Sequence, residues 1–333
     1  MRRGYRSNVR RSLLLGSVFG LAALALAVVL GWWVWRGRQD AASLFRRLPG
    51  ENVLLLYLNV EQLRRTPALI PVLGNAVDPD PDYAAFVRQT GFDYQRDLDR
   101  AAVCYLPDRV YILARGRFDG ARLRSYALDQ GGACADSGLE RPCRMPASQP
   151  GRQVSFLLLE PSLLALATAP EPDAARQLEA APAVSAEPLA QAASTLNAGN
   201  PLLWATATPA SLDRALRQTS AVPNLNLLAA ALAGAQRAYL FVNDRSPRLE
   251  IALQAVCASD AQAAEIRRLL QGLNDLVGGL MRGARRGKTP DPWARVLASA
   301  AINQQKDTVR AVWALDPDLL KDLGTTKGAA PER

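Results

Sequence analysis

The feature that most constrains this chain is a long apolar stretch near its N-terminus. Residues 12–35 contain no charged side chain, and arginines flank them on both sides. As an α-helix, these 24 residues would extend for about 36 Å, which is enough to cross the hydrocarbon core of a bilayer. Trp32, Trp33 and Trp35 stand at the C-terminal end, where indole rings prefer the headgroup boundary. The stretch therefore predicts a transmembrane helix, with membrane lipid as its partner.

The distribution of charge around this helix predicts its orientation. Five arginines precede it and two follow it directly, and the more basic flank stays in the cytoplasm. We therefore expect residues 1–11 to be a cytoplasmic basic segment and residues 36–333 to be extracytoplasmic. Arg10 and Arg11 also fit a twin-arginine export signal, although orientation by positive charge is the simpler interpretation. A cleaved signal peptide fits less well, because the apolar run continues beyond the small residues at 25–27.

The net charge of +9 belongs mainly to the N-terminal segment. Residues 1–39 contain seven arginines and no acidic residue, which leaves 33 basic and 31 acidic residues, or +2, in the remainder. A nucleic-acid-binding domain would concentrate basic residues in its folded part, so we expect no nucleic-acid partner. One local basic cluster is interpreted as a solvated helix end; it consists of Arg282, Arg285, Arg286 and Lys288.

The chain contains no histidine, and this limits the chemistry available to it. Mechanisms of the Ser-His-Asp and Cys-His type are excluded, and so is the commonest metal ligand. Hydrolysis by two carboxylates and a Ser-Lys arrangement stay open, although none of the four lysines lies in an S-x-x-K pattern. We expect no catalytic residue, no cofactor and no metal site.

The four cysteines fall into two groups. Cys134 and Cys143 flank a short polar stretch without zinc-ligand spacing, so in an oxidising compartment they predict a disulfide. Cys104 and Cys257 lie within apolar runs and are interpreted as small buried residues with free thiols.

After residue 50, the chain predicts the same succession of elements twice. The first half predicts strands at 52–58, 101–106, 109–118, 154–159 and 163–168, with helices at 61–65, 83–90 and 173–178. The second half predicts strands at 200–206, 238–243, 248–257, 300–305 and 308–315, with helices at 210–217, 224–233 and 318–323. A longer helix follows the first hairpin of each half, with Asp119 as a cap in one and a Ser259–Gln262 capping box in the other.

This pattern predicts an α+β fold in which the transmembrane helix precedes two related β-α-β-β-α-β-β-α units. Their sheets are expected to be mixed or antiparallel, with helices on one face. The units span residues 51–180 and 200–325, and we expect them to share one continuous or closely abutting sheet, because pairing removes a free edge strand from each. Residues 36–50 and 181–199 are predicted linkers, and residues 326–333 are predicted to form a disordered tail.

Three features together resemble a group of uncharacterised bacterial membrane-anchored proteins with a duplicated extracytoplasmic domain. They are the N-terminal anchor, the opening strand with Gln62-Leu63-Arg64, and the stretch Thr90-Gly91-Phe92-Asp93-Tyr94-Gln95-Arg96-Asp97-Leu98-Asp99. The resemblance spans most of residues 50–325 and implies this architecture without implying an activity. The second half has no copy of residues 90–99.

Two acidic clusters and several glycines are candidates for functional sites. Asp78, Asp80 and Asp82 alternate as in a calcium loop, but Tyr83 and Gln89 stand where glycine and glutamate are required, which favours a polar loop. The second cluster could perform acid–base work, although a solvated helix-to-strand junction is the simpler interpretation; it consists of Asp93, Asp97 and Asp99 with Arg96 and Arg100. The glycines at 31, 37, 131 and 132 lack the spacing of a phosphate-binding loop.

These observations favour a membrane-anchored, non-enzymatic binding or structural protein of the bacterial cell envelope. Its partner would be an envelope protein, a polymer or a lipid. Two alternatives stay open: an anchored hydrolase that uses carboxylates, and an envelope assembly factor or spacer.

Overall fold

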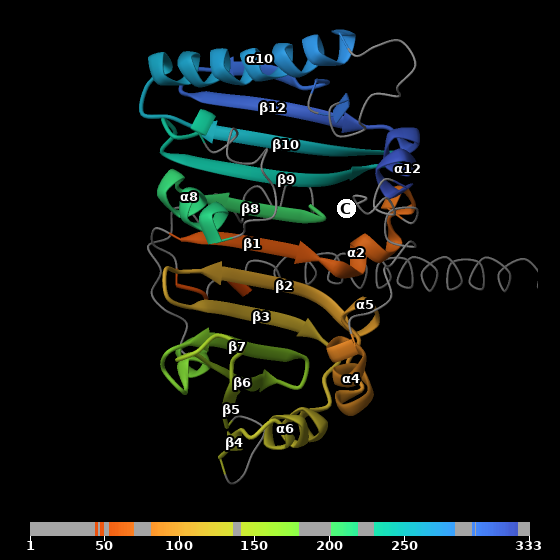
Figure 1. Cartoon of the computed structure of the whole chain (residues 1–333), viewed down its shortest axis with the longest axis vertical. Coiled ribbons are helices and arrows are strands. Elements are labelled where there is room, and N and C mark those ends of the chain that lie inside the picture. The colour runs from red at the N-terminus through yellow and green to blue at the C-terminus, as the bar shows by residue number, and fades with distance from the viewer. Residues whose placement is uncertain are drawn as a thin grey trace, which may run out of the picture.

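The structure is a computed structural model that describes residues 44–45, 47–49, 53–69, 81–135, 141–179, 201–218, 230–283, 295–296 and 298–325. Its described strands form a single 12-stranded sheet in the order β11-β12-β10-β9-β8-β1-β2-β3-β7-β6-β5-β4 (Figure 1). Every pairing in this order is antiparallel. The predicted α+β class is confirmed, with an antiparallel sheet.

The first half of the chain supplies seven of these strands. Its elements are β1 (Leu54–Asn59), α2 (Val60–Arg65), the 3-10 helix η1 (Pro67–Leu69), α4 (Pro81–Thr90), α5 (Tyr94–Asp97), β2 (Leu98–Tyr105), β3 (Val110–Gly116), α6 (Gly120–Asp129), β4 (Ala133–Cys134), β5 (Cys143–Pro146), β6 (Gln153–Glu160), β7 (Leu163–Ala169) and the 3-10 helix η2 (Ala174–Leu178). The sequence did not predict α5 or the β4–β5 hairpin, because four-residue and two-residue elements are too short to show a period.

The second half supplies the other five strands. Its elements are β8 (Leu203–Ala207), α8 (Pro209–Gln218), β9 (Arg237–Arg245), β10 (Arg248–Val256), α10 (Asp260–Gly283), β11 (Ala301–Gln305), β12 (Thr308–Leu315) and α12 (Pro317–Thr325). Most of the helix predicted at 224–233 lies outside the described residues, as do the predicted linker at 181–199 and the predicted tail at 326–333.

The two halves arrange their strands in the same order. Counted outward from the middle of the sheet, the first half runs β1, β2, β3, β7, β6 and the second runs β8, β9, β10, β12, β11. In each half the strand that comes last in the chain lies beside the third strand, and the next-to-last strand lies outside it. The first half then continues with β5 and β4. A duplicated unit requires this agreement; the common origin of the halves stays a prediction.

The halves meet where β1 pairs with β8, at the centre of the sheet (Figure 1). Tyr57 lies opposite Trp204 in this pairing, and both side chains are fully buried. The ring of Phe45 contacts both, with centroid distances of 5.9 Å to Tyr57 and 5.2 Å to Trp204. One hydrophobic core therefore extends across the junction.

This packing revises the boundary of the predicted linker at 36–50. Leu44, Phe45 and Leu48 are at most 2% exposed and belong to the main core cluster. The sequence of this segment shows no helical or strand periodicity, so it did not indicate that these three side chains are buried. The folded part of the chain therefore begins at or before residue 44.

Helices of both halves cover the opposite face of the sheet. In the first half, α4 and α6 pack over β3, β6 and β7 through a cluster that includes Leu123 and Phe156. In the second half, α10 packs over β11 and β12 through Ile266 and Leu270. These two helical layers lie near opposite ends of the sheet (Figure 1).

Among the residues that the structure describes, no helix is long and apolar enough to span a membrane. The predicted transmembrane helix at 12–35 lies outside them, together with Arg10, Arg11, Trp32, Trp33 and Trp35.

Candidate functional site

The acidic cluster predicted from the sequence surrounds the short helix α5. Asp93 caps this helix by accepting the backbone N–H of Gln95 at 2.9 Å, and the same oxygen accepts the hydroxyl of Tyr83 at 2.9 Å. Burial, followed by this hydrogen bond, raises the pKa of Tyr83 to about 12. Asp93 therefore acts as a helix cap and holds α4 against α5.

Asp97 is the most enclosed of the three carboxylates, with the residue 7% exposed. It forms ion pairs with Arg96 at 3.0 Å and with Arg117 at 3.2 Å, and it accepts the backbone N–H of Asp93 at 3.0 Å. The hydrogen bond from Arg96 is the largest cause that lowers the pKa of Asp97 to about 2; the Asp93 N–H and Arg117 add to it. A carboxylate with this pKa stays ionised near neutral pH and cannot serve there as a general acid.

Asp99 has a separate partner. Its Oδ1 accepts a hydrogen bond from Arg64 at 3.1 Å, and another nitrogen of that guanidinium donates to the carbonyl of Leu98 at 2.7 Å. The structure therefore brings the three aspartates together at one helix-to-strand junction, with guanidinium and backbone partners for each. A helix-to-strand junction is what the simpler interpretation predicted, but Asp97 is enclosed in it and not solvated. The junction positions α2, α5 and β2.

The neighbouring residues of the 90–99 stretch also contribute to packing. Thr90 is 1% exposed and donates its hydroxyl to the carbonyl of Phe86 at 2.8 Å, while Gly91 adopts a φ of 73° that favours glycine. Phe92 stacks on Phe118 with a centroid distance of 5.1 Å. Sequence reasoning missed Gly116, where a Cβ would lie 2.2 Å from the carbonyl oxygen of Asp97. The stretch connects α4 to β2 and fixes the close approach of β3.

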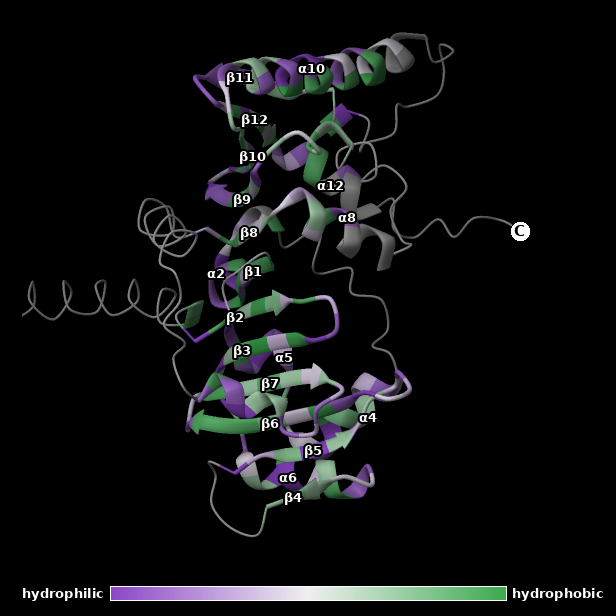
Figure 2. Cartoon of the chain, turned by 90° about the vertical axis from the view of Figure 1, so that its left-hand side faces the viewer, coloured by the Kyte–Doolittle hydropathy of each residue, from purple (hydrophilic) through white to green (hydrophobic). Residues whose placement is uncertain are grey.

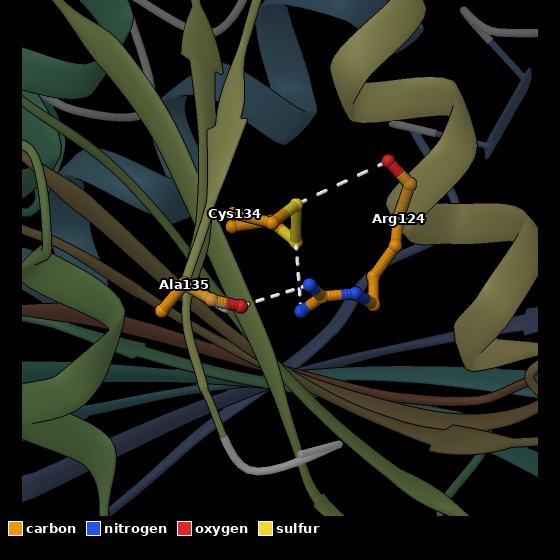
Figure 3. The surroundings of a disulfide bond; sticks show 4 residues. Arg124, Cys134 and Ala135 are labelled. Atoms are coloured by element: carbon orange, nitrogen blue, oxygen red, sulfur yellow. Dashed lines mark hydrogen bonds between the residues drawn. A yellow bond between two sulfur atoms is a disulfide. The ribbon is translucent and has the colours of Figure 1, made fainter. Parts of the chain in front are cut away.

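The predicted disulfide is confirmed. Cys134 and Cys143 are bonded and lie directly opposite each other in the β4–β5 hairpin (Figure 3). Arg124 of α6 reaches this hairpin: it donates to the carbonyl of Ala135 at 2.8 Å and points another nitrogen at Sγ of Cys143, 3.9 Å away. The disulfide and Arg124 together fasten the edge of the sheet to its covering helix.

The other two cysteines are free and buried, as predicted. Burial raises the pKa of Cys104 to about 12, and burial and then Asp307 raise the pKa of Cys257. The thiol of Cys104 donates to the carbonyl of Pro49 at 3.4 Å. Both thiols therefore stay protonated near neutral pH, and the first helps to hold residues 44–49 on the sheet.

Several predicted positions fall partly or wholly outside the described residues. Asp78 and Asp80 lie outside them, whereas Asp82 lies in the first turn of α4. Within the described part of the chain, no group of acidic or cysteine side chains could hold a metal ion. Arg285, Arg286 and Lys288 of the basic cluster also lie outside it, and Arg282 belongs to the last turn of α10.

An apolar surface crosses the middle of the sheet, between the two helical layers. We call it the central apolar band. All its side chains lie on the face opposite to Phe45 and Trp204, and all are partly exposed; they are Leu54, Leu56, Leu58, Val103, Tyr105, Val110, Ile112, Leu203, Ala205 and Leu240. Figure 2 shows the hydrophobic colour of β1, β2 and β3 at the height between α4 and α8. Tyr105 is the most open member, at 40% exposure.

Two hollows lie away from this band, at opposite ends of the sheet. One, of about 10 Å³, lies beside the disulfide, next to Arg124 and Phe156. The other, of about 360 Å³, is polar and open, and it lies between α10 and β11. The first could hold about one water molecule, and the second is lined mainly by polar and charged side chains, so neither offers the continuous apolar surface of the band.

No protein-family model matches the chain, and no curated protein matches it. Solved structures of TP0453 resemble the fold. Crystal form I has a TM-score of 0.44 and 11% sequence identity, covering 85% of this chain and 96% of that chain. Crystal form III has a TM-score of 0.46 and 10% identity, covering 86% of this chain and 97% of that chain. A likeness at this level carries no functional information.

Proposed function

We propose that this chain is a membrane-anchored extracytoplasmic protein of the bacterial cell envelope that binds aliphatic chains on its central apolar band, without catalysing a reaction. The observation that carries the proposal is the band itself: a continuous row of partly exposed, mainly aliphatic side chains on the sheet face between the two helical layers, where α8 contacts β1 and β8. A contiguous apolar surface on a folded domain commonly marks a binding site.

The register of the sheet makes the band continuous across five strands. Leu56 of β1 lies opposite Val103 of β2 on one side and Ala205 of β8 on the other. Val103 in turn lies opposite Ile112, and Ala205 lies opposite Leu240. Directly opposite side chains on one face lie about 5 Å apart, so these five form a ridge across the sheet. A ridge of this length suits an extended alkyl chain better than a compact solute.

The position of the folded part relative to the predicted membrane helix supports a lipid as the source of that chain. Trp35 ends the predicted helix, and Leu44 is already buried in the core nine positions later. Nine residues extend for at most about 30 Å. The sheet would therefore stay within reach of the bilayer surface, where acyl chains are the most abundant apolar ligand.

The acidic groups support a role in binding more than one in catalysis. Asp93, Asp97 and Asp99, the carboxylates on which the hydrolase alternative relied, each hold backbone or guanidinium groups in place. The low pKa of Asp97 keeps it ionised near neutral pH. No observation specifically favours the hydrolase or spacer alternatives.

Photo-crosslinking of the full chain in its membrane tests the binding proposal. Cells are given a palmitate analogue with a diazirine at mid-chain, irradiated, and the labelled peptides of the purified protein are mapped by mass spectrometry. We expect label on peptides covering residues 98–112, because these contain Val103, Tyr105, Val110 and Ile112. Label confined to residues 12–35 would show that the acyl chain contacts only the membrane helix and would overturn the proposal.

A pair of matched variants sharpens this test. Tyr105→Glu places a charge on the band and should reduce labelling of the strands several-fold, because a carboxylate disfavours contact with an alkyl chain. Leu128→Glu is the control, since Leu128 of α6 is 53% exposed and lies outside the band. Equal loss of labelling in both variants would count against the band as the binding surface.

A reporter fusion tests the topology separately. A phosphatase that is active only outside the cytoplasmic membrane is joined after Arg333, and we expect it to be active. An inactive reporter would contradict the extracytoplasmic placement. It would not affect the binding proposal, which the crosslinking experiment tests independently.

A further inference from the structure

We propose that two copies of this chain associate edge to edge, by pairing β11 of one copy antiparallel with β11 of the other. Strand β11 ends the sheet, and among the described residues no strand lies on its outer side. Together with α10 it forms one extremity of the molecule, where a second copy can approach (Figure 2). The proposal concerns an edge of the sheet and does not depend on lipid binding at the central apolar band.

The pairing of β11 with β12 directs the backbone groups of two residues out of the sheet. A two-residue turn at 306–307 joins the strands, so Gln305 and Thr308 close the hairpin as a hydrogen-bonded pair. Hydrogen-bonded and non-hydrogen-bonded pairs alternate along an antiparallel ladder. The N–H and C=O groups of Ile302 and Gln304 therefore point away from β12. Groups in this position are the template on which a further strand is added.

The opposite edge of the sheet is protected against such pairing, whereas the β11 edge is not. At the opposite edge, β4 has only two residues and is held by a disulfide. Short strands and charged side chains are common ways to shield an edge. Strand β11 has five residues, none of them charged, and the side chains of Ala301, Asn303 and Gln305 are exposed. These properties favour the addition of another strand at β11.

Helix α10 runs along this edge in the direction opposite to β11. Near the start of the helix, the side chain of Gln304 donates to the backbone carbonyl of Asp260 at 3.0 Å. Two turns beyond the middle of the hollow's helical wall, Asn274 accepts the backbone N–H of Ala300 at 3.2 Å. Arg267 is halfway along the helix between these two contacts. It therefore lies beside the middle of the strand segment that the contacts enclose, which is residue 302.

The charges on α10 indicate that the added strand belongs to a second copy. Asp260 and Arg267 line a hollow of about 360 Å³ between α10 and β11, together with Ile302 and Gln304. A two-fold axis at Asn303 sets Ile302 of each copy opposite the partner's Gln304, and their outward backbone groups then bond each other. The same axis directs Arg267 of each copy toward the partner's Asp260. Two symmetric pairs of opposite charge result, as a two-fold interface requires.

Backbone and charge together exclude the neighbouring registers. A shift of one residue would set an outward-pointing residue opposite an inward-pointing one, which breaks the ladder. A shift of two moves the axis to residue 302 or 304 and brings Arg267 beside the partner's Arg267, or Asp260 beside the partner's Asp260. At the proposed axis the two Asn303 side chains lie side by side, and an amide can both donate and accept a hydrogen bond. Asn303 is therefore the centre of the interface.

Disulfide crosslinking of the full chain in detergent micelles tests this register. Asn303→Cys sets two cysteines opposite each other with about 4.5 Å between their Cα atoms, a distance that a disulfide spans. Under mild oxidation with copper phenanthroline, we expect a covalent dimer on a non-reducing gel. Gln305→Cys is the matched control on the same strand and face; it lies opposite the partner's Ala301 and should give little dimer. Equal crosslinking of the two variants overturns the proposal, and so does no crosslinking of Asn303→Cys.

Sedimentation velocity over a range of protein concentrations measures the association without crosslinking. We expect a monomer–dimer equilibrium for the unaltered chain. Ile302→Pro should abolish the dimer, because proline removes an outward N–H and keeps the hydrogen bonds to β12. Asn303→Lys should raise the dissociation constant about fivefold by placing like charges at the axis. Ala314→Lys, exposed on the same face of β12, is its control and should have no effect. Circular dichroism establishes that each variant is folded.

A charge exchange tests the contribution of α10. Arg267→Asp or Asp260→Arg alone creates two like-charge contacts and should raise the dissociation constant by roughly tenfold. The two changes in one chain restore opposite charges and should return the dissociation constant to within about threefold of the original. A monomer at all concentrations overturns the proposal, as does a dimer that Ile302→Pro leaves intact or a double variant as weak as the singles. Tyr105→Glu, which tests the apolar band, should not change the dimer.

Discussion

The two halves of the sheet share one strand order but end in different ways. Beyond β6, the first half adds β5 and the two-residue strand β4, which are joined by the Cys134–Cys143 disulfide and held by Arg124. The second half ends at β11, a five-residue strand without a charged side chain, beside the 24-residue helix α10. One edge is thus closed covalently, and the other is left beside an exposed helix. The comparison indicates that the shared strand order, which we call the frame of the sheet, and the structure of its two edges depend on different residues. Buried apolar side chains determine the frame, whereas the disulfide, Arg124 and α10 determine the edges.

The frame depends on apolar side chains that both halves share at their junction, so a change there should have the largest effect. Trp204 is fully buried between Phe45 and the β1 strand. Trp204→Ala should lower the free energy of unfolding by about 3–5 kcal/mol, because it leaves a large cavity in the common core. Urea unfolding of the full chain in detergent, followed by circular dichroism, measures the change.

Trp313 on β12 supplies the control for this junction, since it is only partly buried and lies away from it. Trp313→Ala should cost less than Trp204→Ala. If the unaltered chain unfolds in two separate transitions, the halves do not share one cooperative core, and the comparison changes from one sheet to two linked domains.

The disulfide is the next largest difference between the halves. Replacing both Cys134 and Cys143 by serine should lower the free energy of unfolding by roughly 2–3 kcal/mol, the contribution of a short covalent loop to the entropy of the unfolded chain. Cys257→Ala, which removes a buried free thiol in the other half, is the control; it should change the free energy of unfolding by the same amount with and without reductant, because it leaves the disulfide in place. Non-reducing mass mapping should find one bridge, and a link between Cys104 and Cys257 would contradict the assignment.

The frame was readable from the sequence because it repeats local patterns. The continuous apolar run at 53–58 predicts β1 as a buried strand, and the turns at 107–108 and 306–307 predict hairpins that the sheet contains. Each of these patterns involves residues that are close together in the chain, so it can be recognised without knowledge of the rest of the fold. The succession of strands in each half followed from them.

The edges and the central surface were not readable in this way. Nothing in the sequence near Phe45 shows that it would contact Trp204, because that contact joins residues far apart in the chain. Arg124 and the disulfide meet only after α6 has folded back on β5. The central apolar band appears only when β1 pairs with β8, since each strand by itself has an ordinary buried pattern.

The two halves also differ in their charged groups, because only the first half contains the acidic helix-to-strand junction at α5. Asp97→Asn should lower the free energy of unfolding at pH 7 by on the order of 2 kcal/mol, the value of its lowered pKa. A lowered pKa means that this stability is present above the ordinary pKa near 3.8 and is lost as the pH falls toward 2. The variant should therefore lose less stability than the original chain across that window.

Asp108→Asn is the matched control for this effect. Asp108 also pairs with an arginine, Arg109, which lowers its pKa, but its side chain is 51% exposed. Solvent screens an exposed pair, so this substitution should change stability little. Equal losses of unfolding free energy for Asp97→Asn and Asp108→Asn would show that the enclosure of the α5 junction does not strengthen its ion pairs.

The smallest expected difference concerns the caps of the helices that follow the first hairpin of each half. Asp119 accepts two backbone N–H groups, those of Ala121 and Arg122, each at 3.1 Å. Ser259 accepts one, that of Gln262 at 3.3 Å, while the side chain of Gln262 accepts the N–H of Ala258 at 3.1 Å.

Removing either cap should cost about 1 kcal/mol, with Asp119→Ala the larger because a carboxylate also interacts favourably with the positive end of the helix dipole. Thermal unfolding of the two alanine variants, with Ser259→Asp as the reverse test, measures the order. Ser259→Asp should be neutral or slightly stabilising, because aspartate caps about as well as serine and adds the charge that Asp119 already provides in the first half. A larger loss at Ser259 would mean that α10 depends on its first turn more than α6 does, despite being more than twice as long.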